Sequence, residues 1–197
     1  MKRVILIHGW GGFPDNHWFP WLKQELASRG FQVIVPEMPN NEEPEIEAWV
    51  AKLSEAIGEP DDDTYLIGHS IGCQTIMRFL EKIDKRIGGV IFVAGFFNLI
   101  PSCLRTEEAK IIAKPWLKTI INTERVKNNA KEFIAIFSDN DNAIPLTDKE
   151  LFEKRLNAKT IVEHNKGHFT TKSGVLKLPI VLKELLRISS QKQTLYP

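Results

Sequence analysis

Gly68-His69-Ser70-Ile71-Gly72 is a G-x-S-x-G pentapeptide that follows a short apolar run, Thr64 to Ile67. Apolar residues repeat at helical spacing directly after it, at Cys73, Ile76, Met77 and Leu80. The pattern therefore predicts that a buried strand, a sharp turn and a helix meet at Ser70. Gly68 and Gly72 have no Cβ, which permits a strained turn and close packing of the helix. Such a turn holds a serine hydroxyl exposed, as a nucleophile requires.

Working outward from this turn, similar apolar runs recur along the whole chain with helical patterns between them. The predicted strands are Val4 to Ile7, Phe31 to Val35, Thr64 to Ile67, Gly89 to Val93, Phe133 to Phe137 and Thr160 to Val162. Continuous apolar character indicates strands covered on both faces, as in parallel sheets. We therefore expect an α/β fold with three layers, a doubly wound and mostly parallel sheet of about six strands.

The helical patterns include a stripe formed by Ile46, Trp49, Val50, Leu53 and Ile57. Thr147 to Glu150 has the sequence of a capping box and predicts the start of another helix. The segment 96–129 is longer than a simple crossover requires, and Pro101 and Pro115 are expected to interrupt its helices. Two interpretations fit this segment: a small cap over the carboxyl ends of the strands, or an ordinary crossover with an irregular start.

Composition narrows the class of protein. The chain has 197 residues, 43% of them hydrophobic, which predicts one domain over residues 1–197 with a sizeable core. A formal net charge of +1 with scattered Lys and Arg argues against a nucleic-acid partner. The apolar run Val4 to Ile7 is too short for a signal peptide or a membrane span, so we expect a cytoplasmic protein without membrane contact. Cys73 and Cys103 form no disulfide framework, and Cys73 is expected to be a packing residue.

Functional side chains collect at the carboxyl ends of the strands in such sheets, so partners for Ser70 should follow other strands. Asp139 and Asp141 follow the predicted strand 133–137, and His168 follows the last strand. The chain order Ser, Asp, His is that of an α/β hydrolase. His168 would serve as general base, oriented by Asp141, which lies at the apex of its loop. Asp139 is expected to be a turn residue that binds its own backbone.

The oxyanion hole requires two backbone N–H groups. We expect one from Ile71, at the start of the helix after the nucleophile, and one from Trp10, in the glycine-containing loop His8 to Gly12. His8 and His69 are expected to brace these loops, and His17 and His164 to lie at the surface or behind the site. Candidate walls of an apolar pocket are Trp10, Phe96, Phe97, Trp116 and Phe169. No zinc motif is present, so no metal or cofactor is expected.

With these residues assigned, the chain resembles the small serine-hydrolase family of α/β hydrolases that includes retinoblastoma-binding protein 9. The resemblance extends over nearly the full length. Beyond Gly68 to Gly72 it is carried by Trp18 to Leu22, Met38 to Asn40, Trp49, Lys114 to Trp116, Asp141 to Pro145 and Gly167 to Phe169. It implies a compact hydrolase sheet with Ser70, Asp141 and His168 as the triad, which supports Asp141 over Asp139. The loop His8-Gly9-Trp10 departs from the Pro-Gly-Asn often present in relatives.

The function expected from this pattern is hydrolysis of a small-molecule carboxylic ester or related acyl bond through an acyl-enzyme on Ser70. Thioester and peptide substrates fit the same residues, because the leaving-group preference depends on pocket shape. A second class of function is a hydrolase-fold protein that mainly binds a protein partner. A third is a lyase that uses the triad as a base. The sequence makes no prediction of the oligomeric state.

Overall fold

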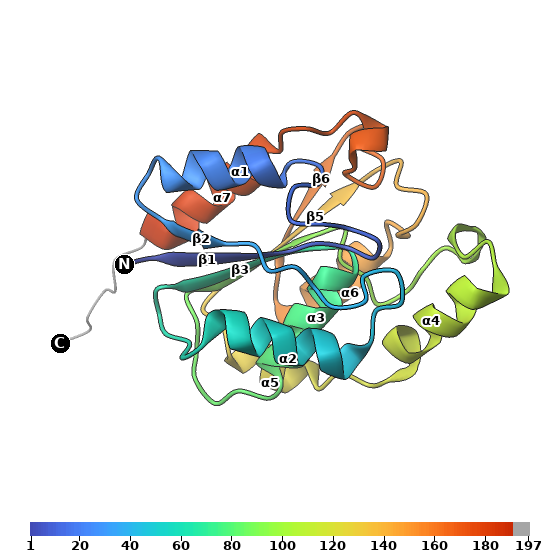
Figure 1. The fold of residues 1–197 in the computed structure, drawn as a ribbon, viewed down its shortest axis with the longest axis horizontal. Helices are drawn as coiled ribbons and strands as arrows, with labels where there is room; N and C mark the ends of the chain where they lie inside the picture. Colours follow the sequence, from blue (N-terminus) through green and yellow to red (C-terminus); the bar gives the residue numbers. More distant parts are fainter. Residues whose placement is uncertain (191–197) are drawn as a thin grey trace.

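The computed structural model describes residues 1–190, and a six-stranded sheet forms their centre (Figure 1). The strand order is β2-β1-β3-β4-β5-β6, and all five neighbouring pairs are parallel. The strands are β1 (Arg3–Ile7), β2 (Gln32–Ile34), β3 (Thr64–His69), β4 (Gly89–Val93), β5 (Phe133–Ser138) and β6 (Lys159–Glu163). The predicted number and direction of the strands are therefore confirmed.

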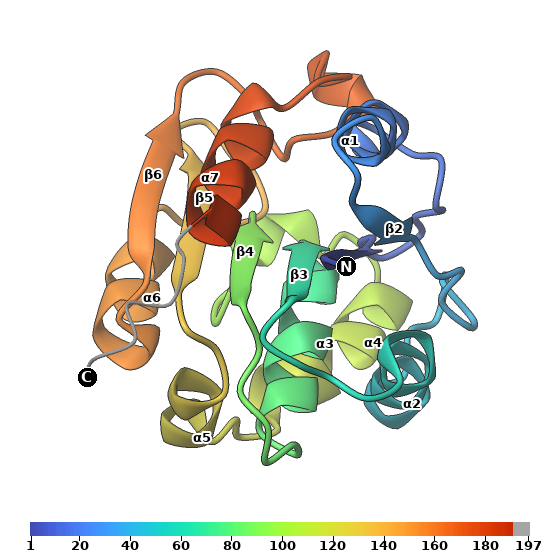
Figure 2. The same ribbon diagram turned by 90° about the vertical axis from the view of Figure 1, so that its left-hand side faces the viewer.

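Helices cover both faces of the sheet, as Figures 1 and 2 show. One face carries α1 (Phe19–Ala27) and α7 (Pro179–Ser190). The other carries α2 (Ile46–Ile57), α3 (Ile71–Leu80), α5 (Thr123–Asn128) and α6 (Asp148–Leu156). A further helix, α4 (Glu107–Lys118), lies beyond the carboxyl ends of the strands (Figure 1). The three-layer α/β architecture predicted from the sequence is confirmed.

Burial follows position in the sheet. All residues of the inner strands β3, β4 and β5 are buried, whereas the edge strands β2 and β6 keep partly exposed residues. Helix α2 buries Trp49, Val50, Leu53 and Ile57 of the stripe expected from its sequence, and Ile46, its first residue, is half-buried. Each such side chain contributes roughly 1.5–3 kcal/mol of transfer free energy. This packing fixes the central strand β3, and with it the turn at Ser70.

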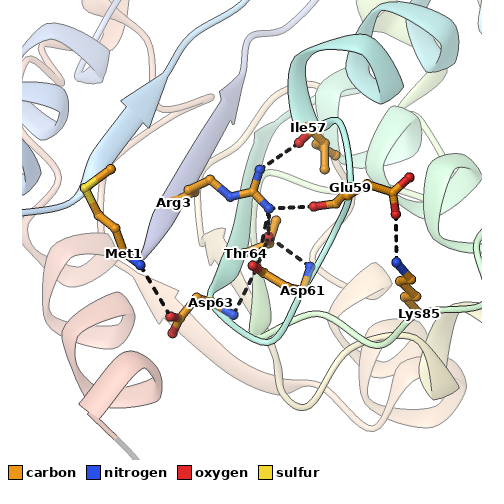
Figure 3. A network of polar contacts seen from close by, with 8 residues as sticks. All are labelled: Met1, Arg3, Ile57, Glu59, Asp61, Asp63, Thr64 and Lys85. Atoms are coloured by element: carbon orange, nitrogen blue, oxygen red, sulfur yellow. Dashed lines mark hydrogen bonds and ion pairs between the residues drawn. The ribbon is translucent and has the colours of Figure 1, made fainter.

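At the amino end of the sheet, Arg3 bonds to the segments that flank β1 (Figure 3). The Arg3 guanidinium donates to the carbonyl oxygens of Ile57 and Glu59 at 2.8 and 2.7 Å, and to the Thr64 hydroxyl at 2.8 Å. These bonds join the first residue of β1 to the end of α2 and to the first residue of β3. The network is structural, because it lies at the opposite end of the strands from Ser70.

Two local predictions about helices were wrong. Thr147 has helical backbone angles and forms no capping hydrogen bond, so the expected capping box is absent. The Asp148 carboxylate is instead fully buried and accepts hydrogen bonds from the amides of Phe97 and Asn98. Pro115 does not interrupt α4, which continues to Lys118. It lies in the last turn, where the Thr119 amide closes the helix on the Pro115 carbonyl at 2.9 Å.

Candidate active site

Ser70 occupies a strained turn between β3 and α3. Its backbone angles are φ 55° and ψ −120°, a region that L-residues rarely adopt and that costs of order 1–3 kcal/mol. The Ser70 amide donates to the Val93 carbonyl of β4 at 2.9 Å, which anchors the turn to the sheet. Ser70 is half-buried and lines a cavity of about 510 Å³. The strand, turn and helix predicted at this position are all present.

The flanking glycines are required sterically, as the sequence predicted. A Cβ at Gly72 would lie 2.4 Å from the carbonyl oxygen of Ile7, which is backbone of the neighbouring strand. A Cβ at Gly68 would lie 2.8 Å from the amide nitrogen of Cys73. Neither contact can be relieved by a side-chain rotation. The two glycines therefore allow α3 to pack against the ends of β1 and β3.

His168 and Asp141 form a buried pair beside this turn. His168 Nδ1 lies 2.9 Å from one Asp141 carboxylate oxygen and 3.1 Å from the other. The Asp141 side chain is 2% exposed and His168 21% exposed. Because a carboxylate only accepts, Nδ1–H is the donor, and Nε2 keeps the free lone pair. The amides of Ala143 and Ile144 also donate to Asp141, at 2.8 and 3.2 Å.

Ser70 and His168 both line the cavity, although no hydrogen bond joins the Ser70 hydroxyl to His168 within residues 1–190. Such bonds are often long in unliganded enzymes and shorten when substrate binds. The structure therefore brings together all three residues expected from the sequence: Asp141 orients His168, and His168 shares the cavity with Ser70. This arrangement can transfer a proton from a serine hydroxyl to an imidazole.

The Asp139 carboxylate bonds to its own backbone amide, as expected, and more strongly to a second loop; these contacts, led by the Asn165 amide and His164, lower its pKa. Its carboxylate accepts from the Asn165 amide at 2.9 Å and from His164 Nδ1 at 2.6 Å. The neighbouring Ser138 and Asn140 side chains accept from the amides that follow Asn165 in the same loop. The residues just before Asp141 thus hold the loop that carries His168. Sequence reasoning missed this because the two loops are far apart along the chain.

The loop 8–12, where one amide of the oxyanion hole is expected, lies directly against Ser70. A Cβ at Gly9 would lie 3.2 Å from Ser70 Cβ. The Gly11 and Gly12 amides donate to Asn41 and Gly9 carbonyls. By contrast, none of the loop and cap hydrogen bonds of residues 1–190 uses the amide of Trp10 or Ile71. Both residues line the cavity, and Ile71 begins a helix.

The predicted pocket walls are partly correct. Trp10, Phe96 and Trp116 line the cavity. Phe169 does not: its side chain is fully buried in the core, because it follows His168 and its backbone has φ 53°. Phe97 is also outside the lining; its ring packs against Phe152 with centroids 4.9 Å apart. The structure adds smaller wall residues, Leu99, Leu104, Ala109, Ala113 and Ala143.

The wall formed by α4 is anchored by a buried arginine. Arg78 of α3 is 1% exposed and donates to the carbonyl oxygens of Trp116 and Thr119 at 3.1 and 3.0 Å. These carbonyls belong to the end of α4, where helices lack internal partners. The Trp116 indole donates to the Pro44 carbonyl at 2.9 Å. Trp116 is thus fixed from two sides, and no sequence pattern singled out Arg78 for this task.

Two further histidines surround His168. His69 Nε2–H donates to the His168 carbonyl at 2.9 Å, which is the bracing role expected for His69. His17 Nδ1 accepts from the Thr171 amide at 3.0 Å, and the His17 and His69 rings are 5.6 Å apart. Burial, and then the nearby His168, lower the pKa of both rings, that of His69 strongly. His17 lines the cavity, a role that its sequence position, away from any strand end, did not indicate.

Of the two free cysteines, Cys103 lines the cavity and Cys73 does not. Cys73 is fully buried, and burial raises the pKa of its thiol, as expected of a packing residue. Among residues 1–190, no three His, Cys, Asp or Glu side chains are grouped to hold a metal ion. Within the same range, no helix is both long and apolar enough to cross a membrane.

Comparisons with known proteins show the family of the chain. A family model described as serine hydrolase matches residues 4–187. YdeN of Bacillus subtilis, named as a hydrolase, is 32% identical over 193 residues, which cover 97% of this chain and 98% of YdeN. The serine hydrolase RBBP9 of Rattus norvegicus is 26% identical over 171 residues, which cover 85% of this chain and 87% of RBBP9.

Solved structures show the same fold. The crystal structure of the B. subtilis ydeN gene product matches with a TM-score of 0.88 at 31% identity, over 97% of this chain and all of that one. Est1E of Butyrivibrio proteoclasticus, in a structure with bound ferulic acid, matches with a TM-score of 0.68 at 16% identity, over 94% and 90% of the two chains. The second likeness concerns the fold alone. The chain belongs to the serine hydrolase family that includes RBBP9.

Proposed function

We propose that this hydrolase cleaves carboxylic esters of small molecules through an acyl-enzyme on Ser70. The observation that carries the proposal is the Asp141–His168 pair, which opens onto the same cavity as the strained turn at Ser70. A buried carboxylate on Nδ1 leaves Nε2 free to accept a proton, and it stabilises the imidazolium that then forms. An amide or thioester can enter the same chemistry, so the ester preference is the finer part of the proposal.

In the first half-reaction, Ser70 Oγ forms a bond to the carbonyl carbon while its proton passes to His168 Nε2. The carbonyl electron pair moves to its oxygen, which the Trp10 and Ile71 amides stabilise. The bond to the leaving oxygen then breaks, and that oxygen takes the proton from His168. The acyl group remains on Ser70 and the alcohol departs.

In the second half-reaction, water attacks the acyl carbon and gives its proton to His168. The bond to Ser70 Oγ breaks, the serine recovers the proton, and the carboxylic acid leaves. No bound metal or organic cofactor takes part in either step of the proposed mechanism. His168 acts as the base in both half-reactions, so each depends on the orientation that Asp141 gives it.

We further propose that residues 96–119 of the 96–129 insertion form a fixed cap over the site, whereas α5 at the end of the insertion packs with α3 and α6 on the face of the sheet. Leu104, Ala109, Ala113 and Trp116 of this segment line the cavity. Both ends of the 96–119 segment are held by buried charged side chains: Asp148 binds the amides of Phe97 and Asn98, and Arg78 binds the end of α4. A wall tied at both ends sets the size of the acyl group instead of opening and closing.

The test is turnover of 4-nitrophenyl esters from acetyl to decanoyl, combined with acid quenching and intact-protein mass spectrometry. The proposal predicts turnover, and a mass increase equal to one acyl group that maps to Ser70. Neither the adduct nor turnover should appear in Ser70→Ala. Absence of turnover on esters, thioesters and aminoacyl amides would contradict the proposal and favour a binding role for the fold.

A further inference from the structure

The cavity has two chemically different ends. The 96–129 insertion contributes apolar residues to one end, among them Leu99, Leu104, Ala109, Ala113 and Trp116. The other end is lined by Asn16, His17, Thr170 and Lys172. Figure 1 shows α4 and the short 3-10 helix Thr171–Ser173 on opposite sides of the carboxyl edge of the sheet, and Figure 2 agrees. Ser70 ends the central strand β3, between these two ends.

The proton transfer assigns each end to one half of the substrate. His168 returns its proton to the leaving oxygen, so the leaving group must lie on the side of His168. Thr170 and Lys172 follow His168 in the same loop, and His17 is bonded to the Thr171 amide of that loop. The leaving group therefore faces the polar end. The acyl group faces the apolar end beneath α4.

The polar end presents hydrogen-bond donors and a cation. Asn16 uses its side-chain oxygen to accept from the Phe13 amide at 2.8 Å, which leaves its NH₂ group available. Because His17 Nδ1 accepts the Thr171 amide, the neutral His17 ring carries its proton on Nε2. Lys172 is exposed and forms no ion pair within residues 1–190. All three groups favour an anion.

No carboxylate opposes this charge in the lining, which within residues 1–190 contains neither Asp nor Glu. The Asp141 carboxylate is paired with His168 and is 2% exposed. Glu42 lies against Gly11 of the 8–12 loop, and its side chain is not part of the lining. Within the cavity lining, the formal charge at the leaving-group end is therefore positive, from Lys172. Asp15 lines a neighbouring hollow that Asn16 and His17 also line.

Building on the proposed ester hydrolysis, we propose that the substrates join an apolar acyl group to a leaving alcohol that carries an anionic group. Asn16, His17 and Lys172 hold the anion, and the α4 side holds the acyl chain. Hydrolysis then releases a carboxylic acid with an apolar chain and an alcohol that carries the anionic group. The same residues select against leaving groups that carry a cation.

The leaving-group half is tested with 4-nitrophenyl butanoate and 3-carboxy-4-nitrophenyl butanoate, each rate divided by its hydroxide-catalysed rate. The wild type should have the higher normalised kcat/KM for the carboxylated ester. Lys172→Gln should lower the ratio of the two esters by about 3-fold, as expected for one exposed charge, and Lys172→Glu should lower it further. Lys82→Gln is the matched control, because Lys82 is exposed and follows the end of α3 that lies away from Ser70. A ratio near one in the wild type, or equal changes in the Lys172→Gln and Lys82→Gln variants, would overturn the anionic assignment.

The acyl half is tested with Ala113→Phe, which fills the apolar end. It should lower kcat/KM for octanoyl relative to acetyl esters by about 10-fold, whereas Ala51→Phe on the exposed face of α2 should not. Ala109→Leu repeats the test at a half-buried position, in case Ala113→Phe does not fold. Unchanged chain-length ratios in a folded variant would overturn the acyl assignment. Labelling of Ser70 by a fluorophosphonate separates the two proposals: labelled enzyme with unaltered ratios contradicts only this inference, and no labelling contradicts ester hydrolysis itself.

Discussion

Asp141 holds His168 Nδ1 at 2.9 Å with a carboxylate that is itself fixed by the Ala143 and Ile144 amides. The carboxylate therefore cannot turn away from the imidazole without losing two further hydrogen bonds. Its 2% exposure also keeps water from competing for the same oxygens. Asp141 thus fixes the His168 ring, while Ser138, Asp139 and Asn140 hold the loop that carries it.

Asp141→Asn should lower kcat by about 10⁴-fold, because an amide NH₂ in place of an oxygen stabilises the wrong tautomer of His168. Asp139→Asn is the matched control in the same loop. Asp139 braces the neighbouring loop through Asn165 and does not contact His168. Asp139→Asn should therefore lower kcat by less than about 10-fold, because His168 keeps its carboxylate partner. Steady-state kinetics on one short ester checks both, and equal losses in the two variants would contradict the assignment of Asp141.

Gly72→Ala should destabilise the protein by about 3 kcal/mol or more, because the new Cβ would meet the Ile7 carbonyl oxygen at 2.4 Å. Gly30→Ala is the control: Gly30 has φ +81°, unlike Gly72, and its Cβ would enter open space. Backbone strain alone should cost it only about 1 kcal/mol. Thermal and urea unfolding measure both values. A loss at position 72 no larger than at position 30 would show that α3 packs less tightly against β1 than described.

Arg78→Met should destabilise the protein by about 2–4 kcal/mol, because the Trp116 and Thr119 carbonyls lose a buried donor. Arg29→Met removes an exposed arginine paired with Glu25 and should cost less than about 0.5 kcal/mol. If the wall moves when Arg78 is removed, the preferred acyl length should shift as well. Chain-length profiles for the two variants test this, and a destabilised Arg78→Met with an unchanged profile would argue against a fixed cap.

Stability should fall as the pH drops below about 6.5, the ordinary pKa of histidine in the unfolded chain. Burial lowers the pKa of His69 in the folded state, so the unfolded state binds more protons in this range. Each such histidine can contribute up to about 1.4 kcal/mol per pH unit. His69→Gln should therefore show a shallower loss between pH 7.5 and 5.5 in urea unfolding. Equal slopes in the wild type and the variant would contradict a neutral, buried His69.

Most of the fold can be predicted from the sequence, because the patterns that specify its strands and turns are local. Each strand is a short apolar run, and Gly68 to Gly72 specify a turn that few other residues could form. His168 and Asp141 could be found because parallel strands place their carboxyl ends at one edge. Residues such as Ser70 thus follow from periodicity and chain order.

The parts that the sequence did not reveal depend on contacts between distant segments. Asp148 appeared to be the second residue of a capping box. Its carboxylate instead binds the amide of Asn98, which precedes β5 in the sequence, whereas Asp148 follows it. Phe169 appeared to be a pocket wall, but it adjoins His168, and neighbouring residues in a tight turn face different ways. His17 and Arg78 act through Thr171 and Trp116, more than thirty residues away in each case. No local pattern encodes such pairs.

Active-site labelling tests whether Ser70 is the activated nucleophile. The protein is treated with a fluorophosphonate, and the intact mass and the labelled peptide are then measured. We expect one equivalent of label on Ser70 in the wild type, none in Ser70→Ala, and much slower labelling in His168→Gln. Full labelling of Ser70→Ala, or a folded wild type that reacts no faster than His168→Gln, would contradict this assignment of Ser70.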